Sequence, residues 1–304
     1  MTDQTVAISL KGVEQRRPHF QLGAIDLDVL QGYVTAIVGP NGSGKSSTFR
    51  LMLDLAKPDK GEIRLLGHKV GDGNDTEVKQ RTGYLPELFS NHDDNMKASA
   101  KTAFVRKWYP SWDGNRYREL LRIFEVDDGI KLGKMSKGTR RKYELALMLA
   151  HDPELLLLDE PSSGLDPLAW RTMIDVLHRF MERGDRTILM ASHIVEEVKR
   201  LADFIVFMGH GRVLGIYEKD ELFSTWHAFY INSDGFTRKQ AELLPGQCSI
   251  EDTGGGTLRI ITRQAMDAER WCEQESLRIV GRQSLNLDDI LAVLIEQDRL
   301  RVRS

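Results

Sequence analysis

The sequence predicts an α/β protein whose main sheet is largely parallel, followed by a small α+β domain. Between residues 34 and 220, short apolar strands alternate with helical segments, which is typical of parallel sheets with crossover helices. A glycine-rich turn joins a buried strand to a helix at 39–47. After about residue 220 this alternation stops and a different mixture of strands and helices begins. We therefore expect two domains, 1–220 and 221–304.

Composition narrows the class of protein. Hydrophobic residues make up 41% and charged residues 29% of the 304 residues, as in ordinary globular proteins. Lys and Arg number 42 against 45 Asp and Glu, and a net charge of −3 does not indicate a nucleic-acid partner. The longest apolar runs, 145–150 and 290–295, have six residues, whereas a membrane-spanning helix needs roughly 18. We expect a chain that does not cross a bilayer by itself.

The N-terminus and the cysteines favour the cytoplasm. The opening stretch "MTDQTVAISLKG" lacks the basic-then-apolar pattern of an export signal. Cys248 and Cys272, the only two cysteines, lie too far apart for a metal or redox motif. We expect both to be reduced, structural thiols.

The first domain begins with strands. "VAISL" and "FQLGAIDLDV" alternate in polarity, and "VTAIV" (34–38) is apolar enough to be buried on both faces. A helix with apolar positions at 49, 51, 52, 53 and 55 should follow the glycine-rich turn and end before Pro58. "GEIRLLG" predicts another strand, and residues 95–151 should be largely helical with a break at "WYPSWD".

From residue 153 the pattern predicts strand "LLLL", helix 167–183, strand "TILMA", helix 194–201, and strands "FIVFM" and "RVLGIY". In the second domain we expect strands at "AFYIN", "CSIED", "TLRIITR" and "LRIVGR", and helices at "QAMDAERWCEQ" and "NLDDILAVLIEQ". This domain contains no motif that can be tied to chemistry, and its role stays open.

The turn at 39–47 has the pattern of a phosphate-binding loop. "GPNGSGKSS" fits G-x-x-x-x-G-K-[ST] and lies between a predicted strand and a predicted helix, which is the setting this motif needs. Backbone N–H groups of the loop and the helix N-terminus would face phosphate oxygens. Lys45 would reach the β- and γ-phosphates, and Ser46 would ligate Mg²⁺. The expected nucleotide-binding residues are Gly39, Pro40, Asn41, Gly42, Ser43, Gly44, Lys45, Ser46 and Ser47.

Two acids follow the apolar strand in "LLLLDEPSSGLD". They should lie at the carboxyl end of the strand, which is the edge where ligands bind in open α/β sheets. Asp159 would hold Mg²⁺, directly or through water. Glu160 would orient and deprotonate the attacking water. His193, just past "TILMAS", could contact the γ-phosphate from the opposite side.

With these motifs in order, residues 5–220 resemble the ATP-binding subunit of ABC transporters. "GPNGSGKSS" resembles the family's Walker A motif, "LLLLDE" its Walker B motif, "SGLD" (163–166) its D-loop, and His193 its switch histidine. The resemblance implies a P-loop NTPase core with an N-terminal antiparallel β subdomain and an inserted helical subdomain at about 88–150. It also implies ATP and Mg²⁺ as cofactors, with Asp166 among the nucleotide-contacting residues.

"KMSKGTRRK" (134–142) occupies the position of the family's signature, usually LSGGQ. Ser136 suits a helix N-cap, and Gly138 allows close approach of the backbone to an anion. The second signature glycine is replaced by Lys137 or Thr139, depending on the alignment. We expect the three basic residues that follow to lie on a solvated helix face or in a partner contact rather than on nucleic acid; they are Arg140, Arg141 and Lys142.

Two further departures from the family pattern concern residues expected around the nucleotide. Glu87, in "GYLPELF", stands where the family has its Q-loop glutamine; it is either a Mg²⁺ ligand or a surface acid of a coupling loop. The aromatic residue that usually stacks on adenine is absent from "LKGVEQRR", and Phe20 or His19 could take its place.

The resemblance implies a cytoplasmic ATPase that lies at the inner face of the membrane through a separate multi-spanning permease, most similar to exporter subunits. Two copies would enclose ATP between the Walker A motif of one and the signature of the other. The alternatives are an ABC ATPase that acts on ribosomes or DNA, and a weakly hydrolysing regulatory subunit. The transported substrate is outside this chain.

Overall fold

The computed structural model describes residues 5–18, 20–73, 75–233 and 235–303. They form two compact units, Met1–Val213 and Leu214–Ser304. The sequence pattern places the boundary at 220, whereas the chain divides inside strand β10 (Arg212–Glu218). The second half of β10 packs with residues that follow it, as the edge-on contact between the rings of Tyr217 and Trp226 illustrates.

A six-stranded sheet organises the first unit, with strand order β10-β9-β3-β8-β7-β6. The pairs β9–β3, β3–β8, β8–β7 and β7–β6 are all parallel, which confirms the predicted sheet. Every residue of β3, β7 and β8 is buried, because helices cover both faces of such sheets. The strands are β3 (Val34–Val38), β6 (Thr82–Leu85), β7 (Leu155–Asp159), β8 (Thr187–Ala191) and β9 (Phe204–Gly209).

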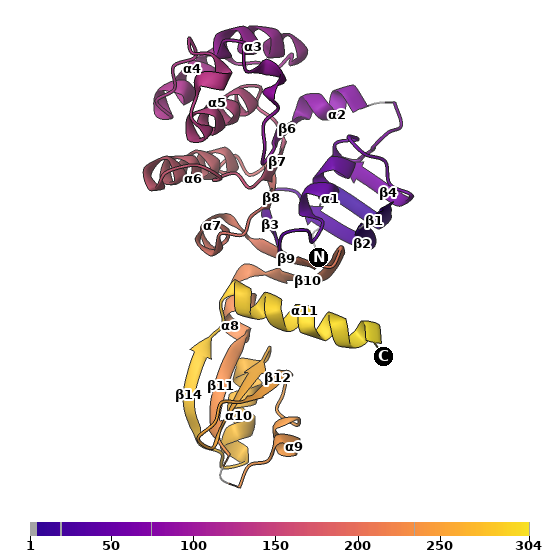
Figure 1. The fold of residues 1–304 in the computed structure, drawn as a ribbon, viewed down its shortest axis with the longest axis vertical. Helices are drawn as coiled ribbons and strands as arrows, with labels where there is room; N and C mark the ends of the chain where they lie inside the picture. Colours follow the sequence, from indigo (N-terminus) through magenta and orange to yellow (C-terminus); the bar gives the residue numbers. More distant parts are fainter. Residues whose placement is uncertain (1–4, 19, 74, 234, 304) are drawn as a thin grey trace. The chain divides into compact units, whose positions relative to one another are not determined.

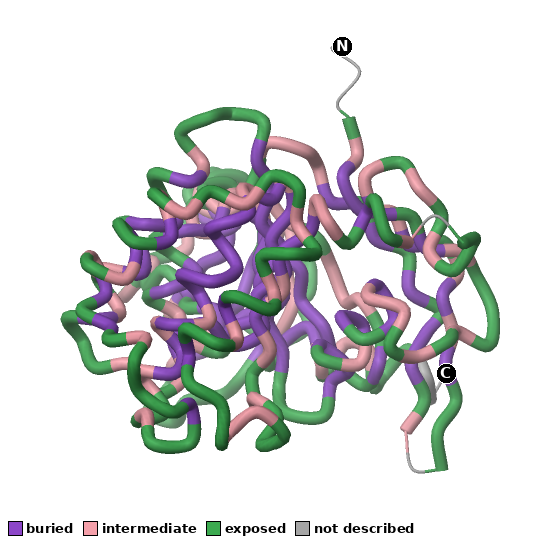
Figure 2. The backbone as a smooth tube through the Cα atoms, turned by 90° about the horizontal axis from the view of Figure 1, so that it is seen from above, coloured by how far each residue is buried: buried purple, intermediate pink, exposed green. Residues whose placement is uncertain are grey.

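The N-terminal strands form a separate antiparallel sheet in the order β2-β1-β4-β5. One hydrophobic cluster joins this sheet to helix α1 and to the parallel sheet, and Figure 2 shows how such buried residues occupy the interior of the backbone. The strands are β1 (Val6–Arg17), β2 (Phe20–Leu30), β4 (Lys60–Leu65) and β5 (His68–Lys69). Strand β2 begins three residues after β1 ends.

Three helices form the expected helical region and lie together in Figure 1: α3 (Ala98–Val105), α4 (Gly114–Ile123) and α5 (Lys137–Leu149). The predicted break between α3 and α4 is present, because α3 gives way to a short 3-10 turn and α4 starts only after its N-cap, Asp113. Four further helices connect the parallel strands. The sequence pattern did not predict one of them, the seven-residue helix α2. They are α1 (Lys45–Met52), α2 (Asp75–Arg81), α6 (Pro167–Met181) and α7 (Val195–Leu201).

The second unit has an antiparallel sheet in the order β12-β13-β11-β14. Its strand and helix order is β-α-β-β-α-β, the split βαβ arrangement, and α10 packs on its apolar core. Cys248 and Cys272 are free thiols. The elements are α8 (Lys219–Thr225), β11 (His227–Asn232), α9 (Arg238–Ala241), β12 (Gln247–Asp252), β13 (Thr257–Thr262), α10 (Ala265–Gln274), β14 (Ile279–Ser284) and α11 (Leu287–Arg303).

Candidate functional site

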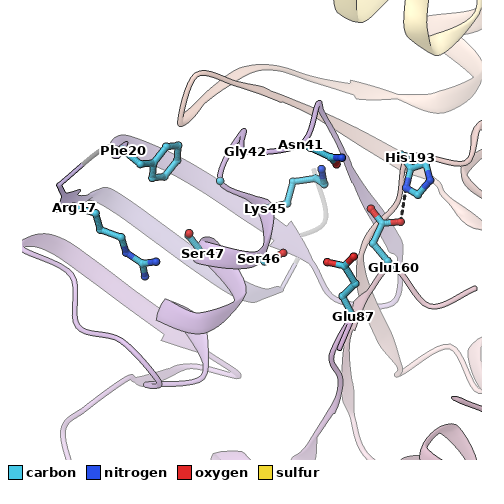
Figure 3. A pocket seen from close by; sticks show the side chains of 11 residues that line it. Arg17, Phe20, Asn41, Gly42, Lys45, Ser46, Ser47, Glu87, Glu160 and His193 are labelled. Atoms are coloured by element: carbon cyan, nitrogen blue, oxygen red, sulfur yellow. Dashed lines mark hydrogen bonds and ion pairs between the residues drawn. The ribbon is translucent and has the colours of Figure 1, made fainter. Parts of the chain in front are cut away.

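A cavity of about 740 Å³ opens at the carboxyl ends of the parallel strands in the first unit. Figure 3 shows its lining: Glu160 and His193 lie at one end, Lys45 and Ser46 in the middle, and Arg17 and Phe20 at the other end. The remaining lining residues are Asn41, Gly42, Gly44, Ser47 and Glu87. The structure therefore brings together residues that the sequence separates by as much as 176 positions (17 to 193).

The glycine-rich turn is packed too closely for side chains at two of its glycines. A Cβ at Gly39 would lie 2.1 Å from the Met208 carbonyl oxygen, and one at Gly44 would lie 2.5 Å from a methyl of Leu22. Gly44 also has a φ of 110°, in the region that favours glycine. The turn can therefore follow its tight path from β3 into α1 only with these glycines.

Lys45, the first residue of α1, is turned back over this loop. Its Nζ donates to the carbonyl oxygens of Gly39 at 2.7 Å and Pro40 at 3.3 Å, and only 7% of the residue is exposed. The ammonium is thus held at the centre of the cavity wall. Ser43, in contrast, is buried behind the loop, so the motif presents backbone and not this hydroxyl to the cavity.

Asp159, the last residue of β7, provides a carboxylate next to Ser46. Burial raises the pKa of this carboxyl, while a hydrogen bond from the Ser46 hydroxyl opposes the rise. Its Oδ1 is buried and has no hydrogen-bond partner. An orphaned carboxylate oxygen beside a hydroxyl is suited to a hard divalent cation. In the part of the chain that the structure describes, no three His, Cys, Asp or Glu side chains cluster closely enough to hold a metal alone.

Glu160 and His193 form a hydrogen-bonded pair at the far end of the cavity. His193 Nδ1 lies 2.7 Å from Glu160 Oε2, and the dashed line in Figure 3 marks this contact. The Glu160 side chain is 9% exposed and that of His193 66% exposed. Glu160 has a left-handed backbone (φ 50°), and its N–H donates to the Ala191 carbonyl of β8 at 2.9 Å. Such strained backbone is concentrated at functional sites, and here it directs the carboxylate into the cavity.

Glu87 lines the cavity from the loop that follows β6, and Arg141 of α5 holds this loop in place. The Arg141 guanidinium donates to the carbonyl oxygens of Pro86 at 2.7 Å and Glu87 at 2.5 Å, and it lies over the ring of Phe89. Burial lowers the pKa of Arg141, which is fully inaccessible. The backbone that carries Glu87 is therefore fixed by the signature helix.

The expectation that Arg140 and Arg141 lie on a solvated helix face is wrong. Arg140 is 6% exposed and pairs with Asp94 at 2.8 Å, Glu144 at 3.3 Å and Asp93. Helix α5 is covered by the loop at 86–94 on the side where both arginines project, which the local run of basic residues could not reveal. Lys142 is half-buried on the next face of the helix.

The signature residues lie outside this cavity. Ser136 caps α5 by accepting a hydrogen bond from the Thr139 N–H at 3.0 Å, and Lys137 Nζ donates to Ser163 Oγ at 2.8 Å. A Cβ at Gly138 would lie 2.6 Å from the Gly164 carbonyl oxygen, so the two turns are in close contact. Asp166 caps α6 by accepting from the N–H groups of Leu168 and Ala169, both at 2.9 Å. None of Ser136, Gly138 and Asp166 lines the cavity of its own chain.

Sequence reasoning missed Arg17, which lines the cavity at the end of β1. No spacing rule distinguishes it from its neighbour Arg16. Phe20, one of the two candidates to replace the missing aromatic residue, also lines the cavity. The other candidate, His19, lies outside the described residues.

Comparisons with known proteins place this geometry in a family. The family model described as ABC transporter matches residues 22–163. The chain is 34% identical to the Nod factor export ATP-binding protein I of Burkholderia orbicola over 67% of this chain and 68% of that protein. It is 32% identical to the daunorubicin/doxorubicin resistance ATP-binding protein DrrA of Streptomyces peucetius, over 72% and 68%.

The bacitracin transport ATP-binding protein BcrA of Bacillus licheniformis is also 32% identical, over 62% of each chain, so this chain spans less than two thirds of that relative. A solved structure described as the dimeric structure of MJ0796, a bacterial ABC transporter cassette, has a TM-score of 0.62 at 23% identity over 69% of this chain and 98% of that chain. Another, an ATP-binding subunit of an ABC transporter, has a TM-score of 0.65 at 24% identity over 72% and 92%. The fold, the cavity and these relatives lead to one conclusion: the chain belongs to the ABC transporter family, among its ATP-binding ATPases.

Proposed function

We propose that this chain binds ATP in the cavity of the first unit, hydrolyses it with Glu160 as general base, and uses the cycle to drive a separate membrane permease of an export system. The observation that carries the proposal is the Glu160–His193 pair, held at 2.7 Å at the end of a cavity whose middle is lined by the glycine-rich turn and Lys45. The Nod factor, daunorubicin and bacitracin proteins support the exporter class by their names.

Residues at different positions along the cavity have different roles in ATP hydrolysis. The backbone of the glycine-rich turn and Lys45 hold the β- and γ-phosphates, since Lys45 exchanges its carbonyl partners for phosphate oxygens. Glu160 orients a water molecule and accepts its proton as the water oxygen bonds to the γ-phosphorus. ADP leaves with the electron pair of the broken P–O bond. His193 holds the Glu160 carboxylate in position and contacts the γ-phosphate from its exposed side.

Asp159, Ser46 and Glu87 are the residues that would hold Mg²⁺. The orphaned Asp159 oxygen and the adjacent Ser46 hydroxyl would supply two hard oxygen ligands, the kind that this ion prefers. The ion would neutralise charge that develops on the phosphate oxygens. Glu87 faces the same side of the cavity and is the third candidate ligand.

A second copy of the chain would complete the site. Ser136 and Gly138 lie at the N-terminus of α5, a 13-residue helix, outside the cavity of their own chain. In a face-to-face dimer this helix end would meet the γ-phosphate held by the other copy, where a helix N-terminus stabilises negative charge. Asp166 would lie at the same interface. MJ0796, whose fold this chain shares, is described as dimeric.

In this proposal, the chain lies at the membrane because it binds the permease. In the described part of the chain, no helix is long and apolar enough to cross a bilayer. We place the protein in the cytoplasm, bound to the inner face of the membrane through the permease, with no nucleic-acid partner.

Substituting Glu160 with Gln tests the proposal. The variant should bind ATP but hydrolyse it roughly 10²–10⁴ times more slowly, because a general base contributes about that factor. Binding is measured by calorimetry and hydrolysis by phosphate release. With ATP present, size-exclusion chromatography should show the variant accumulating as a dimer.

Glu196→Gln is the matched control. Glu196 is an exposed acid of α7 that pairs with Arg200 at 2.9 Å and does not line the cavity. It should hydrolyse ATP at the rate of the unsubstituted protein. Full-speed turnover by Glu160→Gln would overturn the base. A wild-type protein that binds ATP but releases almost no phosphate would favour the weakly hydrolysing regulatory subunit.

Purification from detergent-solubilised membranes tests the partner. A multi-spanning protein that co-purifies supports transport. Ribosomal RNA or duplex DNA in its place would contradict the transport proposal and favour an ABC ATPase that acts on those assemblies.

A further inference from the structure

The end of the cavity farthest from Glu160 and His193 is formed by Arg17 and Phe20 (Figure 3). This inference rests on the proposed function. If the triphosphate lies along Lys45 and Ser46, the base of the nucleotide extends toward this end. The contacts that Arg17 and Phe20 can make with a base therefore decide which nucleotides the chain accepts.

Phe20 packs directly beside the phosphate-binding loop. The tip of its ring lies 3.1 Å from the position that a Cβ at Gly44 would take. The ring is half-buried, so one part is supported by the loop and another part faces the cavity. An aromatic ring in this position can stack on any base, because every base has a π-face.

Arg17 is held by a buried amide. Its Nε donates to Gln15 Oε1 at 3.0 Å, and Gln15, which is 8% exposed, donates through Nε2 to the Lys57 carbonyl at 2.9 Å. Within the described residues, no carboxylate lies within ion-pair distance of Arg17 and its two terminal nitrogens have no hydrogen-bond partner. The Nε contact orients the exposed guanidinium, and within the described residues its terminal N–H groups remain as two coplanar donors beside the cavity.

We propose that Arg17 and Phe20 form the purine site of this cavity, and that Arg17 makes the site accept guanine nucleotides at least as well as adenine nucleotides. Guanine presents two neighbouring acceptors, O6 and N7, which match the two donors of a guanidinium. Adenine presents one acceptor, N7, next to an amino group that is itself a donor. The fork therefore makes one more hydrogen bond to guanine than to adenine.

Equilibrium dialysis of the full chain with ATP and with GTP, in buffer with EDTA so that hydrolysis does not interfere, tests this proposal. GTP should bind at least as tightly as ATP. Arg17→Met should weaken GTP binding about tenfold and ATP binding less than about threefold, since a bidentate contact discriminates between bases by roughly this amount. Phe20→Ala should weaken both about tenfold, because stacking does not depend on the base.

Arg16→Met is the matched control. Arg16 carries the same charge one residue earlier, is exposed, and does not line the cavity. It should leave the ratio of the two affinities unchanged. GTP binding that is weaker than ATP binding, or an equal effect of Arg17→Met and Arg16→Met on that ratio, would overturn the proposal.

The outcomes also separate this inference from the proposed function. ATP binding that is retained while GTP is rejected contradicts the purine site alone. A chain that binds neither nucleotide contradicts the ATPase proposal, and the purine site is overturned with it.

Discussion

The two units of the chain differ in what they bury. Among the described residues of the first unit, seven charged side chains are nearly or fully inaccessible: Lys45, Arg140, Arg141, Asp159, Glu160, Arg186 and Glu197. Within the described residues of the second unit, the buried polar side chains are those of His227 and Thr262. The other buried side chains described in the second unit are apolar, and many of them form one cluster built around β11, β12, β13 and α10.

In the first unit, buried charged groups lower the stability of the fold, but they are held in defined positions. An ion removed from water is costly unless it is paired or hydrogen-bonded, so a core without charges is the simpler way to hold a unit together. The first unit accepts the cost around its cavity, where Arg141 fixes the loop of Glu87 and Asp159 keeps an orphaned oxygen. The second unit has an ordinary packed core.

Arg141→Met should have the largest effect on the first unit. It leaves the carbonyl oxygens of Pro86 and Glu87 buried without partners, and each such group costs about 1–3 kcal/mol. We expect the free energy of unfolding to fall by roughly 2–5 kcal/mol in urea titrations. ATP hydrolysis should also fall, because Glu87 loses its fixed position.

The control for this prediction is Lys142→Met, a change of the same kind at the next position. Lys142 is half-buried and makes no such carbonyl contacts in the described chain, so its substitution should change stability by no more than about 0.5 kcal/mol. Equal losses in the two variants would show that the buried charge is not what stabilises this loop.

Glu197→Gln should have a smaller effect that depends on pH. Glu197 is buried in α7, accepts a hydrogen bond from the Ser192 hydroxyl, and has its pKa raised by burial to about 7. Between the ordinary pKa of a glutamate and this raised value, the folded chain keeps a proton that the unfolded chain releases. The free energy of unfolding of the natural protein therefore falls as pH rises through this window.

Glutamine cannot lose that proton, so the variant should not show this decline. Above the raised pKa it should be more stable than the natural protein by roughly 1–3 kcal/mol, and the gain should disappear toward acid pH. Urea titrations across the window measure it, with Glu196→Gln as the exposed control. A stability difference that is constant with pH would mean that Glu197 does not titrate in this range.

Ile260→Val should have the smallest effect and should be confined to the second unit. It removes one methylene from a fully buried position of β13, which typically costs about 0.5–1.5 kcal/mol. Hydrogen exchange in peptides from 227–284 should become faster, while the ATP affinity stays the same. A change in ATP affinity larger than about twofold would show that the apolar core of this unit influences the cavity.

Much of the fold could be predicted because the informative signals are local. The strands at 34–38 and 187–191 agree with β3 and β8 residue for residue, since a continuous apolar run bounded by polar residues defines both the strand and its burial. The glycine-rich turn at 39–47 and the Asp159–Glu160 pair could also be located from the sequence, because each is a short motif with its own structural setting. Short elements such as α2 and α9 lack a long periodic pattern and were missed.

The parts of the site that could not be predicted depend on distant partners. Arg140 and Arg141 look like a solvated face because their partners lie in the loop at 86–94, about 50 residues away. Arg17 has the same local pattern as Arg16, and only the fold shows which of them faces the cavity. A pattern within one helix or strand cannot show which face another segment will cover.

The contact between Gly138 and Gly164 has a mechanical consequence. Because Gly138 has no side chain, the turn before α5 lies directly against the Gly164 carbonyl, and it cannot move toward the turn at 162–166 without displacing that turn. The Ser163 N–H donates to the Glu160 carbonyl at 3.0 Å, so a displacement of the turn at 162–166 is passed to the backbone of Glu160 itself. A force that pushes the helical region toward this turn from outside the chain would therefore reach Glu160 by direct backbone contact. A side chain at position 138 would force the two backbones apart and disturb this route.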